Sequence, residues 1–138
     1  MLPQAETGIN RPGDEGIATI LRYLPYFEDT TNEFYTVTDE LSFDPYWYSH
    51  RTEAFVRDLY DHGFIQSFDW PNWQKQAVRY YENPDLIARA RLSTLVRLLT
   101  THIRKDRFVS GHLAMMIDEG QITAILRRLA VLFRNEQG

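Results

Sequence analysis

The chain of 138 residues contains no cysteine, which excludes disulfide bonds, thiol catalysis and zinc sites built on cysteine. No stretch reaches the ~18 uninterrupted apolar residues that a membrane-spanning helix needs. Residues 1–16 are polar and lack the apolar core of a signal peptide. We therefore expect a cytoplasmic protein with no membrane partner.

The motifs of several well-known enzyme classes are missing as well. There is no glycine-rich phosphate loop, no pair of zinc-binding histidines with a glutamate between them, and no serine nucleophile elbow. The four histidines lie far apart in the chain, at positions 50, 62, 102 and 112. We predict no metal and no cofactor, and the sequence leaves open whether the protein is an enzyme.

Charge is unevenly distributed along the chain. Residues 1–85 carry 6 Lys/Arg against 15 Asp/Glu, whereas residues 86–138 carry 9 against 4, so the net charges are −9 and +5. A basic C-terminal part can bind phosphate or nucleic acid, but it can equally pack against the acidic part of the same domain. Because the excess is modest and the acidic part repels phosphates, we do not expect nucleic acid as a partner.

Hydrophobic spacing predicts a mainly α protein, a compact bundle of five to six helices with a small β-hairpin or aromatic loop near residues 33–48. Residues 1–14 are expected to form a flexible tail and residues 15–138 a single domain. The expected helices cover about 15–24, 50–62, 69–81, 93–107, 110–120 and 122–133, and a short helix begins at residues 83–84.

Capping residues and prolines set the expected boundaries of these elements. Ser49, Asp69 and Ser93 are predicted N-caps, and Gly63 is a predicted helix stop. Pro25 is expected to end or kink the first helix. Residues 34–38 and 41–43 are rich in aromatic and β-branched side chains and predict the hairpin strands, whereas Pro45 disfavours a strand over residues 46–48.

The densest polar chemistry lies in residues 100–113. On a helical wheel, His102 and Asp106 fall on the apolar stripe, and because they stand four residues apart we expect their side chains to meet. Either the pair simply satisfies itself in the interior, or Asp106 orients His102 as a general base or ligand. His102, Asp106 and His112 are the candidate catalytic residues.

The turn after this helix is a candidate anion site. Ser110 and Gly111 open the next helix, whose free N–H groups suit an anion, and Lys105 and Arg107 can add positive charge. The alternative is that these residues only tie the turn to neighbouring groups. A small anionic ligand is therefore one expected partner.

Aromatic residues form a second candidate surface. Trp70 and Trp73, three apart at a helix start, are expected to share a face, where they either stack on a flat ligand or belong to the core. If they are exposed together with the aromatic residues at 46–48, they would resemble the centre of a protein interface.

The sequence also resembles a family of small prokaryotic proteins of unknown function. The resemblance rests on Arg-Lys-Asp-Arg-Phe at residues 104–108 and Gly-His-Leu-Ala at 111–114, with further matches at 21–27, 68–73 and 125–129, so that it covers about residues 17–132. It implies a compact helical cytoplasmic domain and supplies no activity.

Two functions are carried forward. The first is a non-catalytic or regulatory binding domain that acts through a protein partner or as a homodimer. The alternative is a pocket for a phosphate-bearing molecule or nucleotide, with or without hydrolysis, built on residues 102–112.

Overall fold

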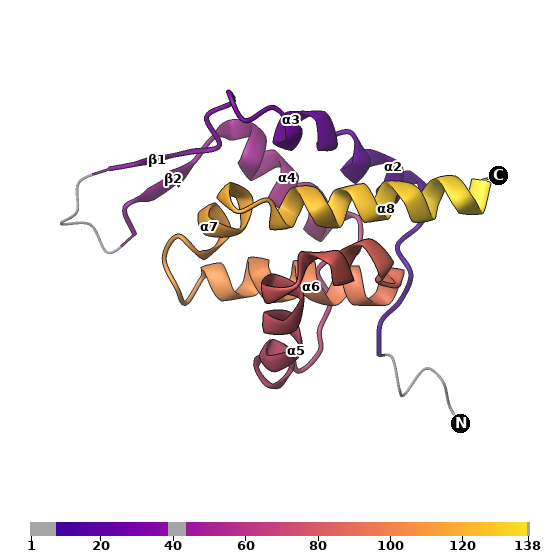
Figure 1. Ribbon diagram of the computed structural model, residues 1–138. Helices are drawn as coiled ribbons and strands as arrows, with labels where there is room; N and C mark the ends of the chain where they lie inside the picture. Colours follow the sequence, from indigo (N-terminus) through magenta and orange to yellow (C-terminus); the bar gives the residue numbers. More distant parts are fainter. Residues whose placement is uncertain (1–7, 39–43, 138) are drawn as a thin grey trace.

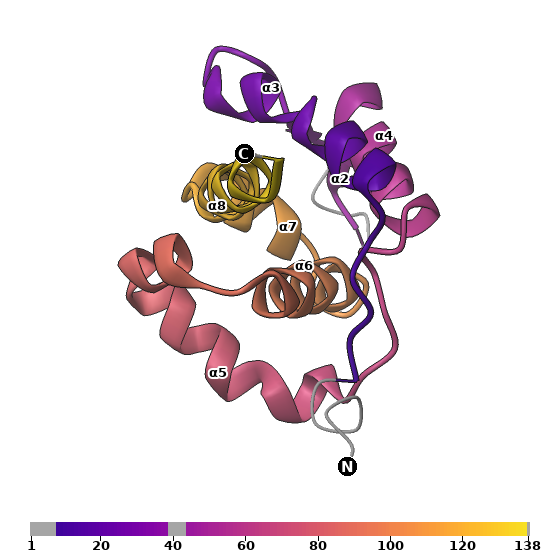
Figure 2. The same ribbon diagram turned by 90° about the vertical axis from the view of Figure 1, so that its right-hand side faces the viewer.

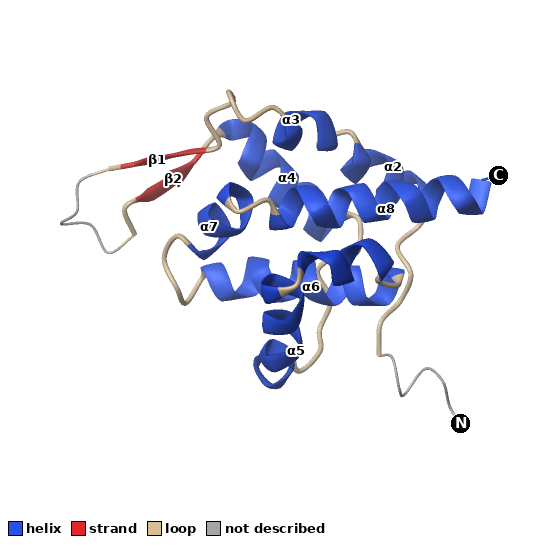
Figure 3. Cartoon of the chain, in the orientation of Figure 1, coloured by secondary structure: helices blue, strands red, loops and turns tan. Residues whose placement is uncertain are grey.

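The computed structural model describes residues 8–38 and 44–137, in which helices dominate and one small hairpin projects from the body (Figure 1, Figure 3). A mainly α fold is thereby confirmed. The elements of the described residues are α2 (Asp14–Leu21), α3 (Leu24–Glu28), β1 (Tyr35–Val37), β2 (Tyr46–Tyr48), α4 (His50–Asp61), α5 (Trp70–Glu82), the 3₁₀ helix η1 (Pro84–Arg89), α6 (Leu92–Asp106), α7 (His112–Asp118) and α8 (Gln121–Gln137).

Helix α6 is the centre of the fold. Viewed nearly along its axis, it lies between α5 on one side and α8 with α2 and α4 on the other (Figure 2). Its residues 95, 96 and 98–103 are all buried, so the helix is enclosed on every side rather than along one stripe. Polar side chains on any face of this stretch are therefore removed from water.

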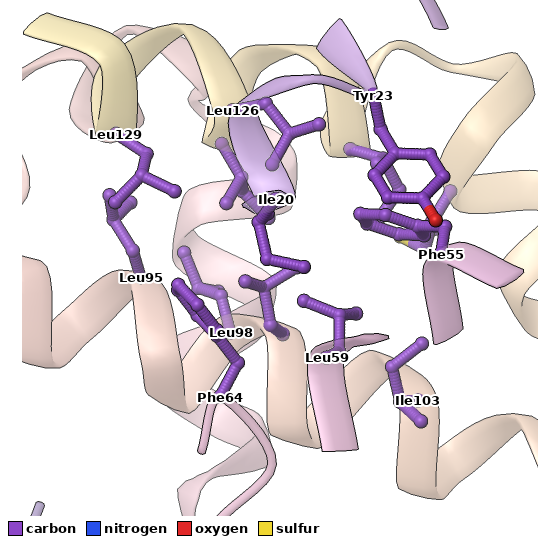
Figure 4. Packing of buried hydrophobic residues seen from close by; sticks show 14 of the residues in the cluster. Ile20, Tyr23, Phe55, Leu59, Phe64, Leu95, Leu98, Ile103, Leu126 and Leu129 are labelled. Carbon is purple, nitrogen blue, oxygen red and sulfur yellow. The ribbon is translucent and has the colours of Figure 1, made fainter. Parts of the chain in front are cut away.

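The core forms where the outer helices meet α6. Leu95 and Leu98 of α6 pack with Ile20 of α2, Leu59 of α4 and Leu126 of α8 (Figure 4). Each of these side chains is almost fully buried. Burying one such side chain contributes about 1.5–3 kcal/mol, so this contact layer fixes the position of α6 in the body.

Most of the predicted helix boundaries are confirmed. The Ser49 side chain accepts from the Thr52 amide at 3.2 Å and the Asp69 side chain accepts from the Asn72 amide at 3.3 Å, as expected of N-caps. Gly63 follows α4 with φ +78°, as expected of a helix stop. Pro84 lies in the first turn of a short helix, which is a 3₁₀ helix.

Two boundary predictions are wrong. Ser93 does not cap α6, because the chain leaves η1 in an extended conformation and the helix already begins at Leu92, with Arg91 in the cap position. The first helix ends at Leu21, before Pro25, and Pro25 instead stands in the first turn of α3. A proline suits that position because its missing N–H would have no partner there.

The hairpin differs from the prediction in its second strand. β1 pairs with β2 in antiparallel register, with Tyr35 opposite Tyr48, so residues 46–48 form a strand despite Pro45. Pro45 stands just before β2 and contributes only its carbonyl, which accepts from the Thr38 amide at 2.7 Å. The missing N–H is therefore not needed. The predicted strand at residues 41–43 lies outside the described residues.

Residues 10 and 11, in the predicted tail, contact the helical body. The Asn10 amide donates to Gln66 Oε1 at 2.8 Å, and Arg11 donates to Glu136 Oε1 at 2.5 Å. The predicted domain boundary near residue 14 stays a prediction. Among the helices of the described ranges, none is long and apolar enough to cross a membrane.

Candidate functional site

The two histidines of the 102–112 stretch bond to each other. His102 Nδ1 on α6 lies 3.0 Å from His112 Nε2, at the start of α7. The predicted contact of His102 with Asp106 is therefore wrong, because α7 folds back on α6 and brings a second imidazole to the ring. The pKa of His102 is lowered to about 3 and that of His112 to about 4, mainly because both rings are buried. Repulsion from the positive charge of Lys105 lowers both pKa values further. Both rings are neutral at pH 7 and share one proton in their hydrogen bond.

Asp106 caps helix α7 instead. Its Oδ1 accepts from the Leu113 amide and from the Tyr48 hydroxyl, both at 2.8 Å, and Tyr48 Oη accepts from the Ala114 amide at 3.2 Å. Burial first, and then the hydrogen bond to Asp106, raise the pKa of the Tyr48 hydroxyl far above its usual range. The free N–H groups expected to hold an anion are thus satisfied by side chains of the chain itself.

Replacing Tyr48 should weaken this junction. Tyr48→Phe removes the hydroxyl that joins β2 to α6 and α7, and leaves the Ala114 amide without its partner, so we expect a loss of about 1–3 kcal/mol in the free energy of unfolding. Urea denaturation measures the loss. Tyr35→Phe is the matched control, because the Tyr35 hydroxyl bonds Asp118 in an exposed setting. Equal losses for the two variants would contradict the assigned role of Tyr48.

A cleft of about 360 Å³ lies between α5, α6 and α7, next to the histidine pair. Its walls are mainly apolar, and Val78, Val109 and Met115 are partly open to solvent there. The Tyr81 hydroxyl bonds Glu119 at 2.6 Å and so links α5 to the end of α7. The lining residues are Gln74, Ala77, Val78, Tyr81, Glu82, Thr101, His102, Lys105, Val109, His112, Met115 and Met116.

Two buried polar atoms belong to residues that line this cleft and have no hydrogen-bond partner among the described residues. They are Thr101 Oγ1 and His102 Nε2, and the two residues are 1% and 3% exposed. The neighbouring Thr100 is the contrast, because its hydroxyl donates to the Phe64 carbonyl and accepts from the Gln66 amide, each at 3.1 Å. An unsatisfied buried polar atom costs about 1–3 kcal/mol, so each one calls for an explanation, such as a functional role, an ordered water or a bound ligand.

The two threonines predict opposite effects on stability. Thr100→Val removes two hydrogen bonds and should cost about 1–3 kcal/mol, whereas Thr101→Val removes an unsatisfied hydroxyl from the interior and should leave stability unchanged or raise it by about 1 kcal/mol. Thermal and urea unfolding of both variants compare them directly. A loss of more than about 1 kcal/mol for Thr101→Val would mean that its hydroxyl has a partner in solution.

The structure divides the remaining candidate residues between different places. Lys105 lines the cleft with the histidines, whereas Asp106 and Arg107 line a separate cavity of about 440 Å³ with Tyr48 and Arg57. The Ser110 hydroxyl donates to Asp44 at 2.8 Å, linking the turn to the hairpin. Across residues 8–38 and 44–137, no three or more His, Asp or Glu residues are grouped to hold a metal ion.

The aromatic candidates also separate. Trp70 contacts Phe108 of the α6–α7 turn at a ring-centroid distance of 6.0 Å, whereas Trp73 packs with Phe68 and Tyr80. In the hairpin, Tyr48 is turned toward α6 and α7, and Trp47 is 64% exposed. No ring contact within the described part of the chain connects the hairpin aromatics to the two tryptophans.

Helical periodicity does not predict the burial of Thr101 or the methionine wall of the cleft. On a wheel with a single apolar stripe, Thr101 falls on the polar side, and it is buried only because α5 covers that face of α6. Two successive threonines at the centre of a long apolar helix were the available signal, because buried hydroxyls need partners from other elements.

The chain belongs to a protein family of unknown function (DUF6508), whose model matches residues 13–135. No curated protein and no solved structure matches it.

Proposed function

We propose that this protein is a non-catalytic binding domain whose ligand site is the cleft between α5, α6 and α7. The observation that carries the proposal is the pair of buried atoms without partners among the described residues, Thr101 Oγ1 and His102 Nε2, in residues that line a mainly apolar cleft. Ligand sites commonly combine apolar walls with a few polar groups that fix orientation. Both atoms are covered in the unbound protein, so a molecule that bonds them has to displace the groups that cover them, and it would then remove their desolvation cost.

Binding without catalysis fits the chemistry of the side chains around the cleft. A general base needs a pKa near the working pH and a group that orients it, but the pKa values of both histidines lie well below neutrality. Asp106 accepts from the Tyr48 hydroxyl and the Leu113 amide, and it lines the other cavity. A cytoplasmic location, which suits a chain without cysteine, is part of the same proposal.

A phosphate or nucleotide ligand is less well supported. Neutral histidines add no charge to the cleft, and Glu82 lines it together with Lys105, so its lining carries side chains of both signs. The amides at the start of α7 are already bonded to Asp106 and Tyr48.

A test of the proposal is a screen of uncharged aromatic fragments by NMR, observed on the methyl groups of Met115 and Met116. We expect fragments that bind to shift these two resonances and to raise the melting temperature. Met1 supplies a methionine signal outside the described residues as an internal reference. Fragments that bind only elsewhere, or none that bind at all, would remove the cleft as the site.

Association with a protein partner or a second copy is the second candidate, and Phe108 favours it. This side chain is 75% exposed in the α6–α7 turn, beside Val109 and in contact with Trp70. Sedimentation and binding assays with Phe108→Ser test the surface, with Val37→Ser in the hairpin as a matched control of similar exposure. Weaker association for Phe108→Ser alone supports the surface, and unchanged association in both variants removes it.

A further inference from the structure

We propose that the ligand of the α5–α6–α7 cleft is a small uncharged planar ring that carries both a hydrogen-bond donor and an acceptor, as a cyclic amide does. This inference rests on the proposed binding function and adds the chemical class of the ligand. It is argued from the polar atoms, the walls and the charges of the cleft.

The two polar atoms, Thr101 Oγ1 and His102 Nε2, favour a ligand that carries both a hydrogen-bond donor and a hydrogen-bond acceptor. The single proton shared by His102 and His112 can belong to either ring. If it is on His102 Nδ1, then His102 Nε2 accepts, and if it is on His112 Nε2, then His102 Nε2 carries a proton and donates. The Thr101 hydroxyl both donates and accepts, so the two atoms can together serve a ligand donor and a ligand acceptor.

The walls favour a flat ring over a flexible chain. Met115 and Met116 bring two thioethers to the cleft, and methionine sulfur makes favourable contacts with aromatic rings. Ala77, Val78 and Val109 add small apolar side chains that a planar ligand can lie against. A volume of about 360 Å³ is at the small end of ligand pockets, which suits one ring or two fused rings.

The electrostatics favour an uncharged ligand. Burial keeps both imidazoles neutral, so neither offers an ion pair to a carboxylate or phosphate. Lys105 and Glu82 line the cleft with opposite charges. A carboxylate or phosphate bound at the Thr101 and His102 atoms would lose its hydration, and the neutral imidazoles would not compensate for that loss.

Three defined probes test the ligand class on the full chain by titration calorimetry and methionine methyl NMR. The probes are 2-pyridone, an uncharged ring with adjacent N–H and C=O groups, benzene, which has the ring alone, and benzoate, which adds a charge. We expect 2-pyridone to bind at least tenfold more tightly than either of the others and to shift the Met115 and Met116 methyl signals.

Two substitutions test the polar atoms. Thr101→Val removes the hydroxyl at nearly constant volume, and His102→Asn places an amide near the position of Nδ1, toward His112, but does not reach the position of Nε2. Each should weaken 2-pyridone about tenfold while leaving benzene unaffected. His50→Asn, at an exposed histidine, is the control and should change nothing.

The outcomes separate the ligand class from the binding function. Tighter binding of benzoate, or equal binding of 2-pyridone and benzene with the same methyl shifts, overturns the ligand class and leaves the binding function in place. If none of the three probes shifts the Met115 and Met116 signals, both are overturned. Retained affinity in folded Thr101→Val and His102→Asn proteins also overturns the ligand class, because the two atoms would then not contact the ring.

Discussion

Lowering the pH from 7 to 5 is expected to reduce the free energy of unfolding by about 4 kcal/mol through the buried histidine pair. The pKa values of about 3 and 4 for His102 and His112 lie below the value of about 6.5 for an exposed histidine. The unfolded chain therefore binds more protons than the folded chain below pH 6.5. Stability is complete above that pH and is lost as the pH falls toward the folded-state values.

The size of this effect follows from the pH interval in which the two histidines are protonated in the unfolded chain but neutral in the folded chain. At pH 5, each group lies about 1.5 pH units below its unfolded pKa, which corresponds to about 2 kcal/mol per histidine. The other titratable residues that line the cleft are Lys105 on α6 and Tyr81 and Glu82 on α5. The positive charge of Lys105 opposes protonation of the two histidines. Asp106, on the same helix as His102, is bonded to Tyr48 instead.

Urea unfolding at pH 7, 6 and 5 measures the loss, and the double variant His102→Leu, His112→Leu is the control. Without the two imidazoles the loss between pH 7 and 5 should fall below about 1 kcal/mol. Imidazole NMR on the wild-type protein gives an independent measurement that needs no variant. Midpoints near 6.5 for His102 and His112 would contradict the prediction, because the two rings would then be accessible to protons in the folded state.

Gly111→Ala is expected to destabilise the protein by about 2–5 kcal/mol, for two separate reasons. Gly111 has φ +81°, in the left-handed region that costs a residue with a Cβ about 1–2 kcal/mol. A Cβ at this position would also overlap the ring of Tyr46, which packs directly on the glycine. Relieving that overlap requires the Tyr46 ring to shift from its place over the α6–α7 turn, at a further cost of about 1–3 kcal/mol.

Gly120→Ala separates the two causes. Gly120 has φ +78°, but a Cβ there would meet no heavy atom within 4 Å, so this variant should show the backbone cost alone, about 1–2 kcal/mol. In a Tyr46→Ala background, Gly111→Ala should approach the same value. Equal losses for Gly111→Ala and Gly120→Ala in the wild-type background would mean that the Tyr46 ring does not restrain the turn in solution.

The position of Gly111 also illustrates what a local sequence pattern contains. A glycine between two helical segments predicts a break with an unusual backbone angle, and that prediction needs no tertiary information. The partner that fills the space above it comes from Tyr46, 65 positions earlier in the chain. The pattern therefore located the turn but not the contact that makes it specific.

The helices follow from the sequence because their signals are local. Ser49 and Asp69 cap helices through amides three residues away, and the apolar spacing of residues 122–133 is that of α8. Where a boundary depends on the path of the preceding chain, as at Ser93, the local signal was insufficient. The same holds for Pro45, whose effect on β2 depends on whether its nitrogen faces a partner strand.

The chemistry of the candidate site was decided by tertiary structure. The sequence identified residues 100–113 as a concentration of polar groups, and Asp106 stands at the expected four-residue spacing from His102. However, α7 folds back to bring His112 to His102, and the hairpin brings Tyr48 to Asp106, so each residue of the expected pair bonds a residue of another element. A side chain forms hydrogen bonds with the groups that helix packing places within about 3 Å of it. The spacing of residues along one helix does not specify those groups.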